Sequence, residues 1–377
     1  MRVLLVDDPF EHAGDAQGRS GDLSVTERVS LRAPLMGMCS VGLRSCRYRW
    51  SLMCRLRWIP HRSLFAAALM VVVSACVPLP PQPPPTSTST TTTASPTPAN
   101  VFEAACAESL VALTSGVVAS GAITELSGLA VSRRQDGVQW AHNDSGDSAR
   151  VFALGADGRD LGQYSLSGAS AVDWEDLAVG PGPSAAVSYL YVGDIGDNAA
   201  ARASVQVYRV PEPDVDPAAG TPAPQALTDV ARLTLTYPDT PHNAETMLVD
   251  PVSGELYIVT KSSSGIAQVF RAPANLADGT TTTLVQVGAV SLGSSVLVTA
   301  GDVTASGDVV ALRTYSSVVL FPRPSGASLA DAFTQTPCSG AVVPEAQGEA
   351  LAFTSDGRGY ITASEGAFPE LHRFTMP

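Results

Sequence analysis

Lysine is almost absent from this chain of 377 residues: Lys261 is the only one, and all the other basic residues are arginines. Charged residues make up only 16% of the sequence, and the 36 acids outnumber the 23 bases. The imbalance grows from residue 101 onward, where 30 acids and 13 bases leave a net charge of −17. A segment this acidic repels nucleic acid and anionic lipid headgroups, so we expect neither as a partner unless a cation intervenes.

The signature motifs of several enzyme classes are also missing. The sequence contains no Gly-x-Ser-x-Gly elbow, no P-loop, no His-Glu-x-x-His and no Cys-x-x-Cys. Serine hydrolases of the α/β type, P-loop NTPases and the common zinc sites are therefore without support. Histidine is scarce as well. The chain has five histidines, and two of them, His12 and His61, precede the acidic segment.

One apolar run, Ser63–Val73, stands out in the N-terminal third. Its 11 residues are too few to cross a hydrocarbon core of about 30 Å at about 1.5 Å per residue. Arg55, Arg57 and Arg62 precede the run, which is the charge pattern of a signal peptide. The segment Val73-Ser-Ala-Cys76 that follows resembles a bacterial lipobox. We therefore predict export, with an ordinary signal peptide and an incidental cysteine as the alternative to a lipoprotein.

This signal divides the chain into four segments. Residues 53–75 are the predicted lipoprotein signal peptide, and Cys76 is the predicted lipidation site. Residues 1–52, upstream of that signal, are interpreted as a non-native or disordered segment. Residues 76–104 are rich in Pro, Thr and Ser and are predicted to be an extended linker. Residues 105–377 are the predicted folded domain, tethered to the cell membrane at its extracytoplasmic face.

Only two cysteines remain in the predicted domain, Cys106 and Cys338. An exported compartment permits disulfides, and a bridge closing so long a loop would stabilise the folded state by about 5 kcal/mol in the chain-entropy account. We predict that the two cysteines pair. The alternative is two unrelated buried thiols.

A repeated phrase organises the predicted domain: an acid, one or two small residues, and a short apolar run. It recurs at intervals of 47 to 70 residues, followed each time by a turn and by strands with period-two alternation. The five copies begin at Glu125, Glu175, Glu245, Asp302 and Glu349. This period is typical of a propeller blade. The sequence therefore predicts an all-β protein, a β-propeller of five blades, or of six if one blade is degenerate.

The last repeat ends after its third strand, whereas an additional strand-like segment, Ser109–Val118, precedes the first repeat. We predict that this N-terminal strand supplies the missing outer strand and closes the ring, which removes the free edges. Closure would also bring Cys106 near Cys338. Fourth strands of earlier blades are predicted at Gly162–Leu166, Arg232–Tyr237 and Thr282–Val290.

The innermost strands of a propeller line its channel, so the five repeated acids are predicted to converge on the axis. Carboxylates confined together repel one another unless they are protonated or bridged by a cation, and oxygen ligands favour Ca²⁺ or Mg²⁺. The alternative is that each acid accepts hydrogen bonds from backbone amides between neighbouring blades. The candidate metal ligands among them are Glu125, Glu175, Glu245, Asp302 and Glu349.

Two second strands end in the same pattern, Asp144-Ser-Gly-Asp147 and Asp194-Ile-Gly-Asp197. An Asp-x-Gly-Asp turn can wrap its oxygens around a calcium ion, because glycine permits the bend. It can equally be an Asx-turn that satisfies its own backbone. These four aspartates join the candidate metal ligands, with Ca²⁺ as the candidate cofactor.

Basic residues occupy the corresponding strand ends of later blades. Lys261 follows one second strand and Arg313 ends another. Together with His142 and Glu365 they are candidates for a mixed acid, base and metal site that binds an anion such as a phosphate ester. Lys261, Arg313 and His142 are the candidate catalytic residues. The alternative for Lys261 is a single survivor of the bias towards arginine.

Several phrases of the predicted domain resemble those of a group of secreted actinobacterial β-propeller lipoproteins. They include Asn143-Asp-Ser-Gly, Asp173-Trp-Glu-Asp, Asp194-Ile-Gly-Asp-Asn, Leu256-Tyr-Ile-Val-Thr-Lys and Gln347-Gly-Glu-Ala-Leu-Ala-Phe. The resemblance covers nearly all of residues 105–377 and implies a propeller outside the cell, but no activity. The acidic strand openings are distantly similar to phytase-like propellers, and that similarity implies phosphate-ester hydrolysis through channel-bound calcium.

Two functions follow as hypotheses. The first is a tethered monomer that binds an envelope ligand or protein through its propeller face, with calcium as a cofactor. The alternative is a calcium-dependent phosphoesterase in which Lys261 and Arg313 stabilise developing charge. A fold alone does not choose between them, and the first hypothesis is preferred because no nucleophile paired with a base stands out.

Overall fold

The computed structural model describes residues 97–218 and 220–377. The predictions for residues 1–52, for the signal peptide 53–75, for Cys76 and for most of the linker 76–104 lie outside the described residues. Within the described part of the chain, no helix is both long enough and apolar enough to cross a membrane.

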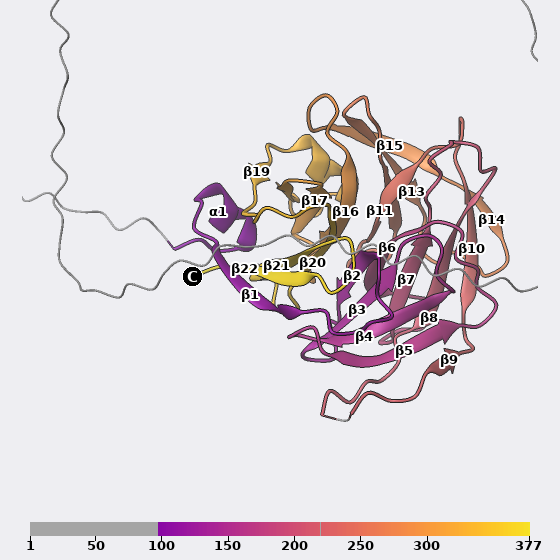
Figure 1. The fold of residues 1–377 in the computed structure, drawn as a ribbon. Helices are drawn as coiled ribbons and strands as arrows, with labels where there is room; N and C mark the ends of the chain where they lie inside the picture. Colours follow the sequence, from indigo (N-terminus) through magenta and orange to yellow (C-terminus); the bar gives the residue numbers. More distant parts are fainter. Residues whose placement is uncertain (1–96, 219) are drawn as a thin grey trace, which may run out of the picture. The chain divides into compact units, whose positions relative to one another are not determined.

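The described residues form five sheets arranged as the blades of a β-propeller, which confirms the predicted all-β class and the blade number. The first strand of each blade lies innermost, and the innermost strands neighbour one another in sequence order around the axis. Their labels, β2, β6, β11, β16 and β20, gather at the centre of the ring in Figure 1.

In blades 1 to 4, the strands lie from the axis outward in the order in which they occur along the chain. Blade 1 contains β2 (Leu126–Val131), β3 (Val138–Asn143), β4 (Arg150–Gly155), β5 (Asp160–Leu166) and the short parallel strand β9 (Gln225–Leu227). Blade 2 contains β6 (Trp174–Pro181), β7 (Ser188–Asp194), β8 (Val205–Pro211), β10 (Ala231–Thr236) and the short parallel strand β14 (Thr281–Thr283). Blade 3 contains β11 (Ala244–Val249), β12 (Leu256–Thr260), β13 (Ile266–Ala272) and β15 (Val285–Ser291).

The last two blades complete the ring. Blade 4 contains β16 (Val298–Val303), β17 (Val309–Thr314), β18 (Val318–Pro322) and β19 (Cys338–Ser339), with the 3₁₀ helix η1 (Leu329–Thr334) before β19. Blade 5 contains β20 (Gly348–Phe353), β21 (Gly359–Ser364), β22 (Glu370–Thr375) and, from the other end of the domain, β1 (Val111–Val117).

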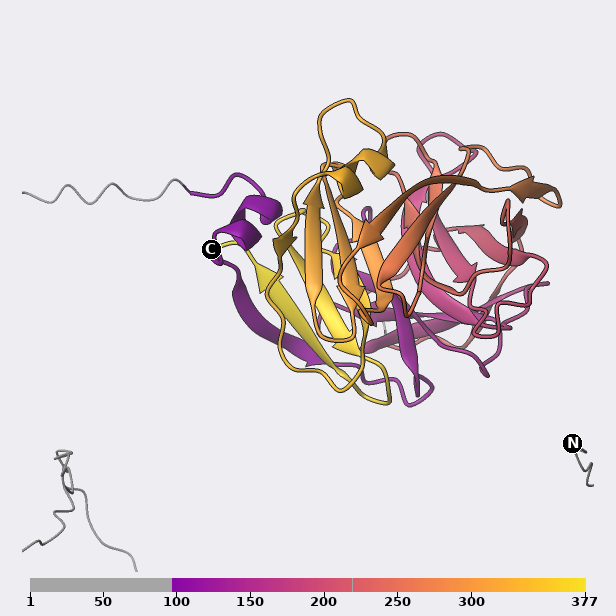
Figure 2. The same ribbon diagram turned by 90° about the horizontal axis from the view of Figure 1, so that it is seen from above.

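Strand β1 closes the ring as predicted. It pairs antiparallel with β22, so that Val111 lies opposite Thr375, and Figure 1 shows the two strands side by side in indigo and yellow. Helix α1 (Val101–Cys106) precedes β1 and crosses the predicted boundary at residue 105. Figure 2 shows α1 beside the C-terminal end of the chain. First and last segments of the domain therefore meet in one blade.

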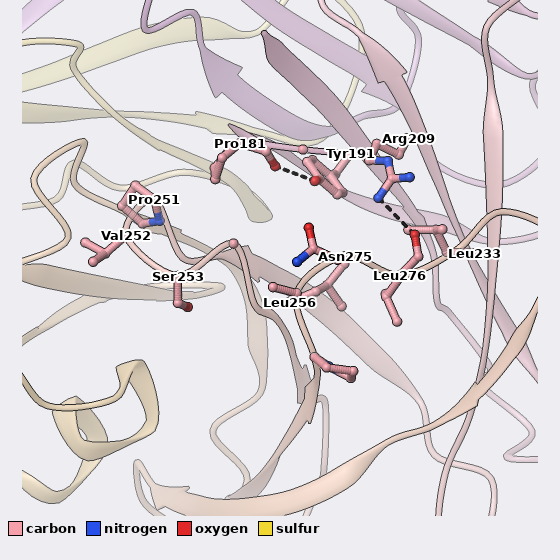
Figure 3. Close-up of a pocket in the computed structure, with 14 residues that line it drawn as sticks. Pro181, Tyr191, Arg209, Leu233, Pro251, Val252, Ser253, Leu256, Asn275 and Leu276 are labelled. Atoms are coloured by element: carbon pink, nitrogen blue, oxygen red, sulfur yellow. Dashed lines mark hydrogen bonds between the residues drawn. The ribbon is translucent and has the colours of Figure 1, made fainter. Parts of the chain in front are cut away.

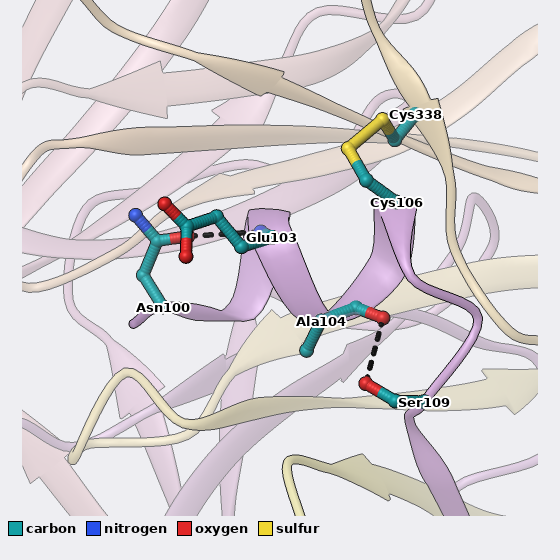
Figure 4. The surroundings of a disulfide bond; sticks show 6 residues. All are labelled: Asn100, Glu103, Ala104, Cys106, Ser109 and Cys338. Carbon is teal, nitrogen blue, oxygen red and sulfur yellow. Dashed lines mark hydrogen bonds between the residues drawn. A yellow bond between two sulfur atoms is a disulfide. The ribbon is translucent and has the colours of Figure 1, made fainter. Parts of the chain in front are cut away.

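A disulfide joins Cys106, the last residue of α1, to Cys338 in β19, as predicted. The Cα atoms lie 5.1 Å apart. Figure 4 shows the bridge at the C-terminal end of α1, whereas the helix is capped at its start by Asn100, whose Oδ1 accepts a hydrogen bond from the Glu103 amide at 2.9 Å. The bridge therefore ties the segment that leads into the closing strand to the outer strand of blade 4.

Five apolar clusters hold the blades together, one at each junction between neighbours. Trp140 of blade 1 and Trp174 of blade 2 are both buried in the cluster between those blades. Tyr360 and Phe374 of blade 5 pack in the same way on blade 4. Successive side chains of a strand point to opposite faces of its sheet, and both faces pack on neighbouring blades. Each sheet therefore contributes to two clusters, and the stability of the ring depends on all five.

One strand prediction is wrong in an informative way. The segment Thr282–Val290 is two strands, because β14 pairs with β10 of blade 2 whereas β15 pairs with β13 of blade 3. Leu284 lies between the two strands and is 1% exposed in the apolar cluster of blades 2 and 3. Because Leu284 is buried at this junction, the chain passes there from the edge of blade 2 to the edge of blade 3.

Candidate functional site

Each innermost strand contains an irregularity in its pairing with the second strand of its blade, near the end where the blade begins. In four blades a single residue is passed over; these residues are Glu175, Glu245, Thr299 and Glu349. In β2 the irregularity covers Ser127 and Gly128. Because a bulge re-aims its side chain, three glutamates and two hydroxyl residues occupy the same level of the five innermost strands.

The two hydroxyl residues at this level tie neighbouring blades together. Ser127 Oγ donates a hydrogen bond to the Glu175 carbonyl at 2.7 Å, and Thr299 Oγ1 donates to the Gly348 carbonyl at 2.8 Å. An ionised carboxylate has no proton to donate in this way. The three glutamates instead lie close enough for their charges to interact: Glu245 raises the pKa of Glu175, and Glu349 raises the pKa of Glu245.

A second level of side chains comes from the residues that directly follow the second strands: Asp144, Lys261, Tyr315 and Glu365. Their backbone is fixed by the strand preceding them in the blade. The amides of Asp144 and Glu365 donate to the carbonyls of Glu125 and Gln347, at 2.9 and 2.7 Å. Four of the five blades thus have a polar residue directly after the second strand.

Six carboxylates from four blades meet at this end of the channel, and we call them the acidic mouth: Asp144, Asp173, Glu175, Glu245, Glu349 and Glu365. Asp144 is central to the set. Its carboxylate lies within 4.8 Å of oxygens of Asp173 and Glu175 on one side, and within the same distance of Glu349 and Glu365 on the other. Two groups of three oxygens, each compatible with a single cation, therefore share Asp144.

Glu175 is the most constrained member of the acidic mouth. The residue is 5% exposed, and its carboxylate receives no hydrogen bond from the part of the chain that the structure describes. Burial, together with the charges of Glu245 and Asp144, raises the pKa of Glu175 to about 11. Without a cation this side chain is therefore protonated at neutral pH, and a cation would have to displace that proton.

Gly196 leaves room for two of these carboxylates. A Cβ at this position would lie 2.2 Å from Glu175 Oε1 and 2.4 Å from Asp173 Oδ2. The glycine of the second Asp-x-Gly-Asp turn is therefore needed for the approach of two acids as well as for the bend. This close approach brings Asp173 and Glu175 together beneath the β7 turn.

On the other side of the channel, Glu245 has a counter-ion of its own. Lys261 Nζ forms an ion pair with Glu245 and donates a hydrogen bond to Tyr315 Oη at 2.7 Å. Burial, opposed by Lys261, raises the pKa of Glu245 to about 7. The only lysine of the chain thus neutralises one of the six acids, and five carboxylates are left without a basic partner within the described residues.

Glu349 is held by an amide. Gln347 Nε2 donates to Glu349 Oε1 at 2.8 Å and also bonds Glu365. Burial raises the pKa of Glu349 to about 7 despite this hydrogen bond, and burial with the charge of Asp144 raises the pKa of Glu365. The two carboxylates are therefore oriented towards Asp144 but remain electrostatically costly.

Glu125 and Asp302 do not share the level of the other repeated acids, so the repeat alignment is wrong at these two positions. Glu125 directly precedes β2 and is exposed. Asp302 lies three residues beyond the bulge at Thr299, and its carboxylate accepts hydrogen bonds from the amides of Val303 and Phe353, both at 2.7 Å. Asp302 therefore makes the inter-blade backbone contact that was the alternative to metal binding.

The two Asp-x-Gly-Asp turns are each closed by an arginine. Arg150 contacts Asp147 Oδ1 at 2.8 Å, and Arg202 contacts Asp194 Oδ1 at 2.9 Å. Asp197 accepts a hydrogen bond from the Arg202 amide at 2.7 Å. Local backbone bonds of the Asx-turn kind are also present, because the Ser145 amide donates to Asp144 Oδ1 at 2.5 Å and the Ser148 amide donates to Asp147 Oδ1 at 2.7 Å. Asp144 differs from the other three aspartates because its carboxylate also belongs to the acidic mouth.

Of the three predicted catalytic residues, His142 and Arg313 are buried in the protein interior. His142 is fully buried, its Nδ1 lies 2.8 Å from the Asn143 carbonyl, and burial lowers its pKa. Arg313 is 1% exposed and forms an ion pair with Glu345. Lys261 alone reaches the acidic mouth, where Glu245 and Tyr315 already engage it.

Sequence reasoning missed Asp173, and it placed Glu365 in the mixed acid, base and metal site without counting it among the metal ligands. Glu365 could have been recognised as a ligand from position, because it directly follows a second strand. The same rule marks Asp144 and Lys261. Position does not single out Asp173, because Glu125 precedes its own innermost strand in the same way and is exposed. The register of the strand pairs, rather than the resemblance among acidic phrases, determines which side chains lie together in the acidic mouth.

No family model matches the sequence, and the search of the curated proteins found no match. Among solved structures, the chain is similar to a gluconolactonase from Xanthomonas campestris, with 14% identity over 74% of this chain and 93% of that chain and a TM-score of 0.42. It is also similar to Raptor from Chaetomium thermophilum, with 11% identity over 70% of this chain and 21% of that chain and a TM-score of 0.33. Neither similarity carries a conclusion about activity, and the resemblances to secreted actinobacterial lipoproteins and phytase-like propellers stay predictions.

Proposed function

We propose that the protein is an extracytoplasmic propeller that binds Ca²⁺ in its acidic mouth and uses the bound ion to bind an envelope ligand or protein. The observation that carries this proposal is Glu175, a buried carboxylate without a hydrogen-bond donor, aimed at Asp144 and Asp173. An ionised carboxylate in this place costs free energy, which protonation relieves in the calcium-free protein and a bound cation would relieve in its place. Calcium fits best, because it accepts several carboxylate oxygens in flexible geometry.

The charge of the domain indicates what a bound ion would do. A surface with a net charge of −17 from residue 101 onward repels anionic groups. A cation held by three carboxylates keeps open coordination positions, through which an oxygen of a ligand can bind. The proposal places this surface outside the cell, on a linker anchored through Cys76, and treats the protein as a monomer.

The positions of the predicted catalytic residues favour binding over phosphoester hydrolysis. His142 and Arg313 are buried away from solvent, and Lys261 is paired with Glu245. A hydrolase needs groups that can reach the substrate, and none of the three is free to do so. A calcium titration followed by thermal unfolding, beside a phosphomonoesterase assay with and without chelator, tests the choice. We expect a calcium-dependent rise in melting temperature and no turnover; metal-dependent turnover abolished by Glu245→Gln would establish the phosphoesterase instead.

Replacing Gly196 by alanine is expected to weaken calcium binding by about tenfold or more without changing any charge. The new Cβ would push Glu175 and Asp173 apart, and Ca²⁺ affinity depends on ligand number and geometry. Isothermal titration calorimetry measures the effect. Gly288→Ala is the matched control, because a Cβ there meets nothing within 4 Å. Equal affinities for the two variants would contradict the placement of the ion.

Calcium affinity is expected to increase by about tenfold or more from about pH 5.5 to about pH 7.5. Glu245 and Glu349, each with a pKa raised to about 7, bind protons more tightly in the folded than in the unfolded chain. Their contribution to the stability of the calcium-free protein is therefore full below about pH 4.5 and is lost as the pH rises through about 7. Calcium bound at Asp144, Asp173 and Glu175 has to displace the proton of Glu175, whose pKa is raised to about 11, and is favoured further as the neighbouring Glu245 and Glu349 ionise. Titrations at several pH values measure the trend, and an affinity independent of pH in this window would contradict it.

A further inference from the structure

A second polar pocket lies at the other end of the blades, away from the acidic mouth. It has a volume of about 120 Å³ and lies between blades 2 and 3, where the loop after β6, the loop after β11 and the segment after β13 meet. Figure 3 shows Arg209 of β8 and Asn275 of the last segment at its edge. At roughly 30 Å³ per water molecule, the pocket has room for a small polyatomic ion.

Arg209 is a buried cation without a carboxylate partner among the described residues. It is 7% exposed, and its partners within the described chain are uncharged: Nη1 donates to the Leu276 carbonyl at 3.3 Å, and the side chain also bonds Tyr191. The guanidinium also lies 5.9 Å from the centre of the Tyr189 ring. A guanidinium has five N–H donors, so most of its hydrogen-bonding capacity is unused.

The acids of the neighbouring loop already have partners of their own. Asp250 binds Arg323 with oxygens at 2.8 and 3.0 Å, and Glu255 lies 3.2 Å from Arg271. Neither is therefore free to neutralise Arg209. An unpaired buried charge is costly, and in a domain so rich in acids the absence of a carboxylate beside this arginine is a specific feature of the pocket.

Asn275 supplies a second donor beside the guanidinium. It lines the pocket, its φ is 60°, and none of the hydrogen bonds of the described chain involves its side chain. The other polar group nearby, Tyr191 Oη, already donates to the Pro181 carbonyl at 2.5 Å. Guanidinium and amide N–H groups together bind the oxygens of an anion. Leu233 and Leu256 contribute apolar wall to the pocket, and Asn275 is exposed at its opening.

We propose that this pocket is a binding site for a small oxyanion, a carboxylate or a phosphate, held by Arg209 and Asn275. The site is independent of calcium and of the acidic mouth, since it lies at the opposite end of the innermost strands and uses none of the same residues. It would give this acidic protein a place for an anion that needs no bridging cation.

Titrations of the metal-free protein with sodium acetate and, separately, inorganic phosphate test the site, at constant ionic strength in chloride. Metal is removed on a chelating resin, because a soluble chelator is itself a polycarboxylate. We expect saturable binding of at least one anion by calorimetry, with a matching rise in melting temperature. Acetate alone identifies a carboxylate site, phosphate alone a phosphate site, and both a general oxyanion site. No saturable binding of either anion would overturn the proposal.

Three variants locate the binding. Arg209→Met keeps the length and apolar contacts of the side chain and is expected to bind about tenfold more weakly or worse. Arg159→Met, which removes an exposed arginine paired with Asp157, is the matched control and should bind like the wild type. Asn275→Gly keeps the positive φ, removes only the amide and should weaken binding a few-fold, which decides the question if Arg209→Met does not fold. Wild-type affinity in both pocket variants would overturn the proposal.

Discussion

Replacing Glu175 by glutamine is expected to lower the affinity for Ca²⁺ on the order of a hundredfold, the largest effect of any single substitution in the acidic mouth. The substitution removes a ligand charge and leaves the shape of the site. Glu125→Gln is the informative control, because Glu125 begins the same acidic phrase but is exposed and acts on the acidic mouth only through its charge on Glu365. Calorimetric titration of the two variants should give a large loss for the first and less than about a threefold change for the second. Comparable losses would favour the sequence alignment over the structural register.

The same substitution should leave the calcium-free protein as stable as the wild type, or more so. Since burial and neighbouring acids raise the pKa of Glu175 to about 11, the side chain is already neutral at pH 7, and an amide of the same shape replaces a protonated acid. Calcium binding to the wild type therefore has to release a proton. Titration in buffers of different ionisation enthalpy measures that release, which should disappear in Glu175→Gln. Strong destabilisation of the calcium-free variant would contradict this protonation state.

Removing the disulfide is expected to produce the largest loss of stability. With Cys106 and Cys338 both replaced by serine, the unfolded chain regains the freedom of a loop spanning a sequence separation of 232, worth about 5 kcal/mol in the chain-entropy account. The melting temperature should fall by about 10 to 20 °C. Reduced wild-type protein is the matched control and should melt with the double variant.

Calcium binding distinguishes the loss of stability caused by removing the disulfide from a change in the acidic mouth. The bridge joins α1 to the outer strand of blade 4, whereas the ion is proposed to bind on the axis, so the double variant should keep its calcium affinity at temperatures where it is folded. A melting temperature within about 2 °C of the oxidised wild type would show that the pairing of β1 with β22 closes the ring without help from the covalent link.

Much of the fold was predictable because a propeller repeats its signals. Each blade begins with an apolar innermost strand, and five copies gave the blade number, the closing role of the Ser109–Val118 segment and the pairing of Cys106 with Cys338. The exchange of a short strand between blades 2 and 3 was not predictable, because it depends on burying Leu284 at a junction that only the assembled ring creates.

The candidate site was predicted in part for a related reason. Glu175, Glu245 and Glu349 were found because identical residues stand at equivalent positions, but Glu125 and Asp302 were added by resemblance of the local phrase. The sequence does not display strand register, and a shift of two or three residues moves a side chain to the rim or to a backbone contact. The ion pairs between arginines and the Asp-x-Gly-Asp turns, such as Arg202 with Asp194, could not be predicted from the motif, because the arginine lies outside it.

The most direct test is a crystal structure of the protein grown with calcium, with the ion located by its anomalous scattering. A peak at about 2.3 to 2.6 Å from carboxylate oxygens of Asp144, Asp173 and Glu175 is the expected result. Crystals grown at saturating calcium that hold no ion among these three residues would contradict the account.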